Sequence, residues 1–307
     1  MKKNYIYILL ILIFIFEILT NSNSIMASVS TSFNIWKSSL FPALFPMFVF
    51  SSILIDLGIT EIISKSRIKL INKIFNINSP SVFIFIMSIF SGFPSSAKYI
   101  KELYDKKIIN KYNAEKIILF SHFANPMFII GTISLSFLNN KNLCFIIIFS
   151  HYIVNFIIGL FLRNYNPSIN TDNNFSYESV SLGTSISKSI LNAINTLLLI
   201  LGTVTFFLII TTLIDINFNL NLPIKTLIFS LTEMTQGIRH ISLLNISLKL
   251  KCTFITMILS FGGLSIHLQT FSIINDLSIK YKNYLFVRII HSLISGLIVF
   301  FLYDLFY

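Results

Sequence analysis

Two short polar motifs interrupt apolar runs of this sequence, and they hold the side chains best suited to bind a solute. The first, SGFPSS, runs from Ser91 to Ser96, and the second, TEMTQG, runs from Thr232 to Gly237. Glycine permits a sharp turn and a close approach of ligand to backbone, while hydroxyl groups and free N–H groups at a helix start bind anions. The motifs predict a solute site that includes Ser91, Gly92, Ser95, Ser96, Thr235, Gln236 and Gly237.

Glu233 is a carboxylate inside an otherwise apolar segment. An ionised side chain at the centre of a membrane helix costs at least ~2.5 kcal/mol unless it is paired or neutralised. Glu233 is therefore a candidate proton or cation site, or a group that orients a ligand; the alternative is a solvated residue at the mouth of a hairpin. An ionised Glu233 would repel an anion, so transport of an anion requires it to be protonated or paired with Arg239 or His240.

A second pair of interruptions lies in longer apolar runs, at Asn125-Pro126 and at Gly262-Gly263. Proline removes a backbone donor, so the first could be only a kink, but the matching glycine pair favours two discontinuous helices. His122 and His267 lie within a few residues of these breaks. They could bind a carboxylate, carry protons or form interhelical hydrogen bonds. We therefore add Asn125, Gly262, Gly263, His122 and His267 to the predicted site.

The composition excludes an ordinary soluble domain. Of 307 residues, 54% are hydrophobic and only 11% are charged, against about 25% charged in average globular chains. The mean hydropathy is +0.80. The net charge is +11, but so apolar a chain has too little polar surface to gather this charge into a nucleic-acid interface. The expected partner is therefore the lipid bilayer. The sequence predicts an integral, multi-pass, all-α membrane protein.

Motifs for enzymatic chemistry are absent from the sequence. It has no Walker loop, Rossmann fingerprint, HExxH or metal-ligand spacing, and the two cysteines, Cys144 and Cys252, cannot form a disulfide framework. We expect no enzyme, no catalytic residue, no cofactor and no metal.

The lengths of the apolar runs predict about seven transmembrane helices plus two re-entrant hairpins. A spanning helix needs roughly 20 apolar residues. Runs of about that length are 5–20, 36–57, 117–138, 145–162, 190–214, 254–274 and 285–302. The runs 81–90 and 226–231 are too short to span and each ends in a polar motif, so we interpret them as hairpins.

The elements recur in the same order in two halves, which predicts an internal repeat. Gly92 and Gly237, Ser121 and Ser260, and His151 and His291 are separated by 139 to 145 residues. Three crossings in each half invert the second half relative to the first, and inverted repeats with broken helices are typical of secondary transporters. The excess of lysine over residues 98–116 places the N-terminus and that stretch inside.

The expected organisation has four parts. Residues 1–32 form an N-terminal signal anchor, with a cleaved signal peptide as the alternative. Residues 33–164 form the first repeat, 165–187 a polar linker, and 188–307 the second repeat.

Four ordered motifs resemble the YlbJ-type sporulation integral membrane proteins of the nucleoside-recognition, or Gate, group. They are SIFSGFPSSAK (88–98), FSHFANPMF (120–128), TEMTQG (232–237) and LSFGGLSIH (259–267). The resemblance implies a fold related to concentrative nucleoside transporters. It also implies a role in endospore formation, moving dipicolinate, a small-molecule anion, from the mother cell across the outer forespore membrane.

Two other functions stay open. The same fold could carry a nucleoside or nucleobase, driven by a proton or cation at Glu233. The protein could instead be a non-transporting membrane scaffold for spore assembly, although a scaffold does not need four helix breaks. A coupling proton or cation and a homo-oligomeric state are compatible with each transporter hypothesis.

Overall fold

Helices make up all regular secondary structure in the residues that this computed structural model describes, which are 2–65, 69–165 and 181–306. Five helical segments are long and apolar enough to cross a membrane: Ser22–Asp56, Leu143–Asn164, Leu182–Phe218, Leu248–Ile273 and Tyr281–Phe306. The prediction of an all-α polytopic membrane protein is confirmed.

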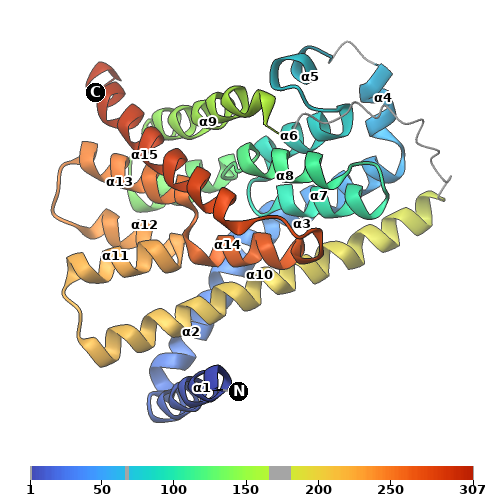
Figure 1. Cartoon of the computed structure of the whole chain (residues 1–307). Coiled ribbons are helices and arrows are strands. Elements are labelled where there is room, and N and C mark those ends of the chain that lie inside the picture. Colours follow the sequence, from blue (N-terminus) through green and yellow to red (C-terminus); the bar gives the residue numbers. More distant parts are fainter. Residues whose placement is uncertain (1, 66–68, 166–180, 307) are drawn as a thin grey trace.

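The N-terminal region contains one continuous long helix preceded by a separate short one (Figure 1). Helix α1 (Lys2–Thr20) is followed by α2 (Ser22–Ile35), a π-helical segment η1 (Trp36–Leu40) and α3 (Phe41–Asp56). Pro42 lacks the N–H that would bond to residue 38, which explains a change of helical winding before it. Because α2, η1 and α3 are continuous, the boundary expected after residue 32 falls inside a helix.

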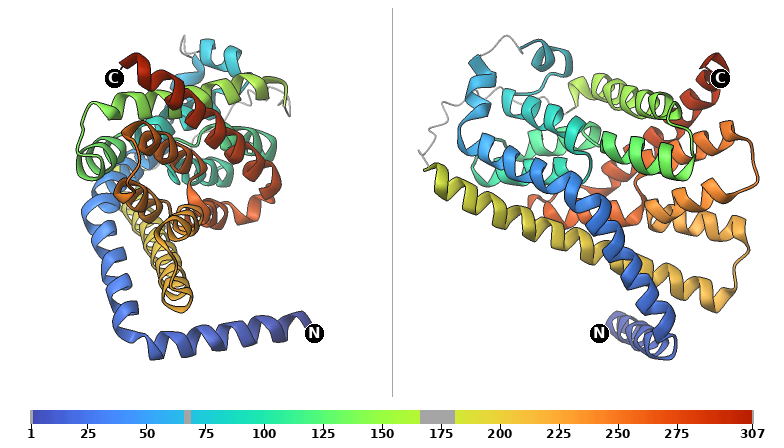
Figure 2. Two further views of the ribbon diagram at one scale, coloured as in Figure 1. Left: turned by 90° about the vertical axis from the view of Figure 1, so that its left-hand side faces the viewer. Right: turned by 180° about the vertical axis from the view of Figure 1, so that it is seen from behind.

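Helix α1 extends away from the body of the protein (Figure 2). Its large apolar side chains between Tyr5 and Leu19 are exposed. At Lys2–Thr20 it is shorter than the five candidate spans.

The first half continues with a hairpin, a broken helix and a long helix. After α4 (Ile59–Lys65) and α5 (Lys69–Phe75), the hairpin is α6 (Ser79–Ser91) and α7 (Ser95–Asp105). The broken helix is α8 (Lys111–Phe120) with π-helical η2 (Phe128–Phe137); the long helix is α9 (Leu143–Phe161), which ends in a 3-10 turn, η3 (Leu162–Asn164). Asparagine side chains cap the starts of α6 and α8, at Asn78 and Asn110.

The second half has the same order of elements. Helix α10 (Leu182–Phe218) leads into the hairpin α11 (Leu222–Thr232) and α12 (Met234–Leu243). The broken helix is α13 (Leu248–Phe261) with α14 (Gly263–Ile273), and after η4 (Asn275–Leu277) the long helix is α15 (Tyr281–Phe306). Residues 166–180 of the predicted linker lie outside the described residues, and the boundary expected at 188 falls within α10.

The two hairpins enter the body from opposite ends, and their turns lie near its middle (Figure 1). The long helices flank them: α3 packs along α10, where the Trp36 indole N–H donates to the carbonyl of Leu197 at 2.9 Å.

Two of the seven expected spans are not among the five long apolar helical segments. The N-terminal run forms α1, which is short, and the run 117–138 is interrupted over residues 121–125, where the sequence predicted a break, and so gives two short helices. The physical reason for the second difference is Pro126, which cannot donate a backbone hydrogen bond.

Candidate solute-binding site

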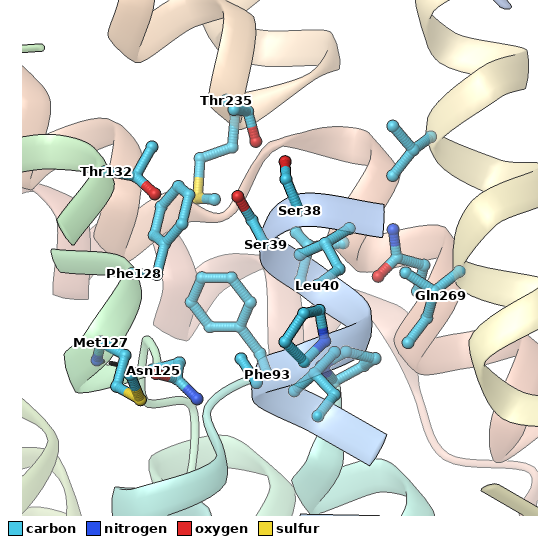
Figure 3. Close-up of a pocket in the computed structure, with 18 of the residues that line it drawn as sticks. Ser38, Ser39, Leu40, Phe93, Asn125, Met127, Phe128, Thr132, Thr235 and Gln269 are labelled. Atoms are coloured by element: carbon cyan, nitrogen blue, oxygen red, sulfur yellow. Dashed lines mark hydrogen bonds between the residues drawn. The ribbon is translucent and has the colours of Figure 1, made fainter. Parts of the chain in front are cut away.

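A cavity of about 360 Å³ lies where the turns of the two hairpins meet, and we call it the central cavity. Its walls come from η1, the α6–α7 turn, η2, α10, the α11–α12 turn and α14 (Figure 3). The volume is within the range of about 300–1,000 Å³ that is usual for small-molecule sites. Its polar lining residues are Ser38, Ser39, Asn125, Thr132, Glu233, Thr235 and Gln269.

Of the residues predicted from sequence, Asn125, Glu233 and Thr235 line this cavity. Asn125 also ties the first break to the first hairpin, because its amide donates to the carbonyl of Ser91 at 3.1 Å. Its side-chain oxygen accepts from the backbone N–H of Met127 at 2.8 Å. The same residue therefore shapes the backbone and faces the solute space.

Glu233 is 2% exposed and caps the start of α12. Its carboxylate accepts a hydrogen bond of 2.8 Å from the backbone N–H of Gln236, the arrangement expected of an N-cap residue. Among the described residues no cation lies within ion-pair distance of it, and Arg239 is exposed. The carboxylate thus reaches the cavity without a charged partner.

The predicted serines and Gln236 are buried but do not line the cavity. The Ser91 hydroxyl lies 2.6 Å from the Tyr99 hydroxyl, inside the first hairpin. Ser95 and Ser96 lie in the first turn of α7.

The predicted glycines allow close packing at the turns and breaks. Gly92 has a φ of 77°, and a β-carbon there would lie 2.4 Å from the backbone nitrogen of Asn125. A β-carbon at Gly237 would lie 2.3 Å from the Cα of Ser230, so this glycine lets α11 and α12 touch. Gly262 and Gly263, with φ of 91° and 68°, form the break between α13 and α14.

The two predicted histidines lie beside the breaks, behind the cavity wall. The ring of His122 stacks on Phe93 with centroids 4.6 Å apart, and its Nδ1 lies 3.0 Å from the Tyr284 hydroxyl. His267 contacts the Phe261 carbonyl at 2.8 Å through Nε2 and the Tyr281 hydroxyl at 3.0 Å through Nδ1. Phe93, rather than His122, meets the solute space.

Side chains from α9 and α15 satisfy the backbone groups freed at the first break. Such groups cost several kcal/mol if left in lipid. Arg288 donates to Leu119 O, Asn155 to His122 O at 2.7 Å and Tyr152 to Ala124 O at 2.8 Å, while His151 Nε2 accepts from Ala124 N at 2.9 Å. The non-helical segment between α8 and η2 is therefore firmly held.

Sequence reasoning missed Gln269, the most informative polar residue of the cavity. The side chain is fully buried, and neither amide atom has a hydrogen-bond partner within the part of the chain that the structure describes. An unsatisfied buried polar group costs about 1–3 kcal/mol. The available signal was an amide in an apolar helix, two residues after the LSFGGLSIH motif.

Aromatic walls were also missed. Phe93 and Phe128 face the central cavity (Figure 3). Phe93 lies inside the SGFPSS motif, but the predicted site included only the serines and the glycine of that motif. Together with Gln269 they offer a planar apolar surface beside a polar edge.

The comparison with known proteins finds a relative over most of the chain. The chain is 24% identical to the sporulation integral membrane protein YlbJ of Bacillus subtilis (strain 168), over 88% of this chain and 75% of that protein. No family model matches the chain, and no solved structure matches it. This likeness extends over most of the chain, and it is to the type of sporulation integral membrane protein that the four sequence motifs resemble.

Proposed function

We propose that this protein is a sporulation transporter that moves dipicolinate from the mother cell across the outer forespore membrane. The observation that carries the proposal is the central cavity, which is built from two hairpin turns and two flanking broken helices. Broken helices around a midplane site are typical of secondary transporters. The printed name of the Bacillus subtilis relative supports the sporulation setting, and the cargo follows from the family resemblance.

The chemistry of the cavity suits a small planar aromatic acid. Phe93 and Phe128 supply ring faces, and aromatic rings gain about 0.5–1.5 kcal/mol from favourable stacking beyond the area they bury. The Gln269 amide offers one donor and one acceptor that lack protein partners among the described residues. A ring that bears one ionised and one protonated carboxyl group can satisfy both, since the first accepts from the amide N–H and the second donates to the amide oxygen.

The lone carboxylate of the cavity implies coupling to protons. Glu233 lines the cavity, and the lining contains no lysine or arginine among the described residues. An ionised Glu233 would repel a carboxylate at close range in a medium of low dielectric constant. Binding of an anion therefore requires a proton on Glu233 or on the solute, so a proton would travel with the cargo.

A lining with one carboxylate and no lysine or arginine among the described residues also favours a second candidate, a nucleoside or nucleobase. A neutral base needs no nearby cation and could pair with Gln269 and Glu233 while stacking on Phe93. A cation at Glu233 would then supply the driving force.

Uptake into proteoliposomes tests these alternatives. We expect accumulation of dipicolinate, and none of nucleosides, when the pH gradient drives protons in the direction of uptake. Glu233→Gln keeps an acceptor for the Gln236 N–H and should abolish uphill accumulation while exchange persists. Glu61→Gln is the matched control, because Glu61 is an exposed partner of Lys65.

Each contrary result has a distinct meaning. Saturable nucleoside uptake without dipicolinate flux would establish the second candidate. Absence of both fluxes in protein that still supports sporulation would favour the membrane scaffold.

A further inference from the structure

A second cavity, of about 400 Å³, lies along α7 toward the open end of the first hairpin. We call it the vestibule. Its charged lining comes mainly from α7, including Lys98, Lys101 and Glu102, while α10 adds Lys188 and the neutral amide of Asn195. Its polarity contrasts with the apolar central cavity, so it suits water and ions rather than lipid.

The vestibule and the central cavity share three helices, and on each helix their lining residues are one turn apart. The pairs are Pro94 and Lys98 on α7, Ile200 and Thr196 on α10, and Gln269 and Ile273 on α14. Four residues correspond to about one helical turn. The two spaces are therefore consecutive along the same walls.

We infer that the vestibule is the route by which an anionic solute reaches the central cavity, and that Lys98 is the cation it meets at the junction. That the solute is an anion rests on the proposed function, whereas the inferred route does not depend on that function. Lys98 belongs to the vestibule lining and lies one turn beyond Pro94 of the central cavity. It supplies the positive charge that the central cavity lacks.

Lys98 can bind an incoming anion because its ion pair with its own carboxylate partner, Glu102, is longer than the ion pairs of the neighbouring lysines. Lys98 is 5% exposed, and its ammonium donates to the Ser52 hydroxyl at 2.9 Å and to the Phe48 carbonyl at 3.4 Å and lies 3.5 Å from the Glu102 carboxylate. Ser52 donates to the same Glu102 oxygen at 2.7 Å. The separation from Glu102 exceeds that of a strong charge-assisted hydrogen bond, so a carboxylate arriving from the vestibule can bind Lys98 without breaking the Ser52–Glu102 bond.

The neighbouring lysines are already neutralised. Lys101 binds Asp105 and, at 2.8 Å, Asp276. The hydrogen bond from Lys101 lowers the pKa of the Asp276 carboxyl, which lies in the loop before α15. Lys106 binds Asp56. Among these lysines, Lys98 thus has the longest ion-pair contact with a carboxylate.

The route is tested by labelling a cysteine in the central cavity. In a background in which Cys144 and Cys252 are replaced by serine, Thr132→Cys is reacted with membrane-impermeant methanethiosulfonates in proteoliposomes. We expect labelling from the side that also labels Lys107→Cys. Asn195→Trp should fill the vestibule and slow labelling of residue 132 severalfold, whereas Leu198→Trp, on an exposed face of the same helix, should not.

Labelling of residue 132 only from the opposite side, or at an unchanged rate in Asn195→Trp, would overturn the route. These readouts involve no cargo. If they hold while dipicolinate uptake fails, the proposed cargo is wrong and the route stands.

The charge at the junction is tested by the ratio of labelling rates for an anionic and a cationic reagent at residue 132. We expect Lys98→Gln to lower the anion preference by about ten-fold, the lower end of electrostatic steering effects. Lys107→Gln, an exposed lysine just beyond α7, is the control and should leave the ratio unchanged. The double variant Lys98→Gln/Glu102→Gln replaces the pair by two neutral side chains and serves if the single variant does not fold. An unchanged ratio in folded protein would remove Lys98 from the proposal.

Discussion

The backbone of Gly92 approaches that of Asn125 so closely that a β-carbon on the glycine would lie 2.4 Å from the asparagine nitrogen. This contact joins the turn of the first hairpin to the first helix break. It places both at the edge of the central cavity, which Asn125 and Phe93 line.

Gly92→Ala should therefore destabilise the protein and impair transport. A non-glycine residue in a backbone region used almost only by glycine costs about 1–3 kcal/mol, and the clash with Asn125 adds to this because backbone cannot easily shift. Thermal unfolding in detergent measures the effect. Gly202→Ala, at a helical site with open space around it, should instead be neutral or stabilising by up to about 1 kcal/mol. Equal stability of Gly92→Ala and wild type would contradict the close approach.

Gln269→Leu should separate stability from function. The leucine removes an unsatisfied buried amide, so we expect a higher unfolding temperature, corresponding to about 1–3 kcal/mol. Binding of the solute should be weakened or lost, because the buried amide that can both donate to and accept from a planar ring has gone. Thermal unfolding and ligand-binding calorimetry test the two parts. Lower stability with intact binding would mean that the amide is paired inside the protein.

Tyr152→Phe should destabilise the contact between the first hairpin and the first break and so lower the unfolding temperature. The hydroxyl lies 2.9 Å from the carbonyl of Ile89 and 2.8 Å from that of Ala124. Its removal leaves a buried carbonyl without a donor, at a cost of about 1–3 kcal/mol. Tyr112→Phe is the matched control because that tyrosine is 61% exposed. Equal unfolding temperatures for the two variants would argue against this role.

The inverted repeat predicts opposite sides for two loops. In the cysteine-free background, Lys107→Cys in the α7–α8 loop and Asn245→Cys in the α12–α13 loop should react with impermeant reagents from opposite faces of the membrane. Both native residues are exposed, so access does not depend on opening of the protein. Labelling of both from one face would rule out the inversion.

The positions of the helix breaks could be predicted from sequence because their causes are local. Gly92, Pro126 and Gly262 each have a backbone property that a regular helix does not accommodate. These interruptions also gave the order of elements in each half. The continuity of α2 with α3 was not predicted, since the apolar runs 5–20 and 36–57 are separated by more polar residues and were interpreted as separate spans.

The identity of the cavity-lining side chains could not be predicted in the same way. It depends on how each helix is rotated against its neighbours, which is set by packing between segments far apart in sequence. Ser91 and Phe93 are two residues apart, yet the serine binds Tyr99 while the phenylalanine faces the cavity. Gln236 was predicted from its motif and lies outside the lining, whereas Gln269 lines the cavity from the middle of α14.

The two breaks differ in the hydrogen bonds that hold them, and this difference determines which part of the protein can move at a low energetic cost. The first is held by side chains of α9 and α15, and hydrogen bonds of this kind contribute about 0.5–1.5 kcal/mol each. At the second, the Phe261 carbonyl is bonded to His267 of the adjoining α14, and the turn consists of two glycines. In mechanical terms the first break is a fixed joint and the second a hinge. Displacement of α14, together with the α11–α12 turn that touches Gly263, requires breaking the bond between His267 and the Tyr281 hydroxyl, whereas displacement of residues 119–124 requires breaking all four bonds of the first break.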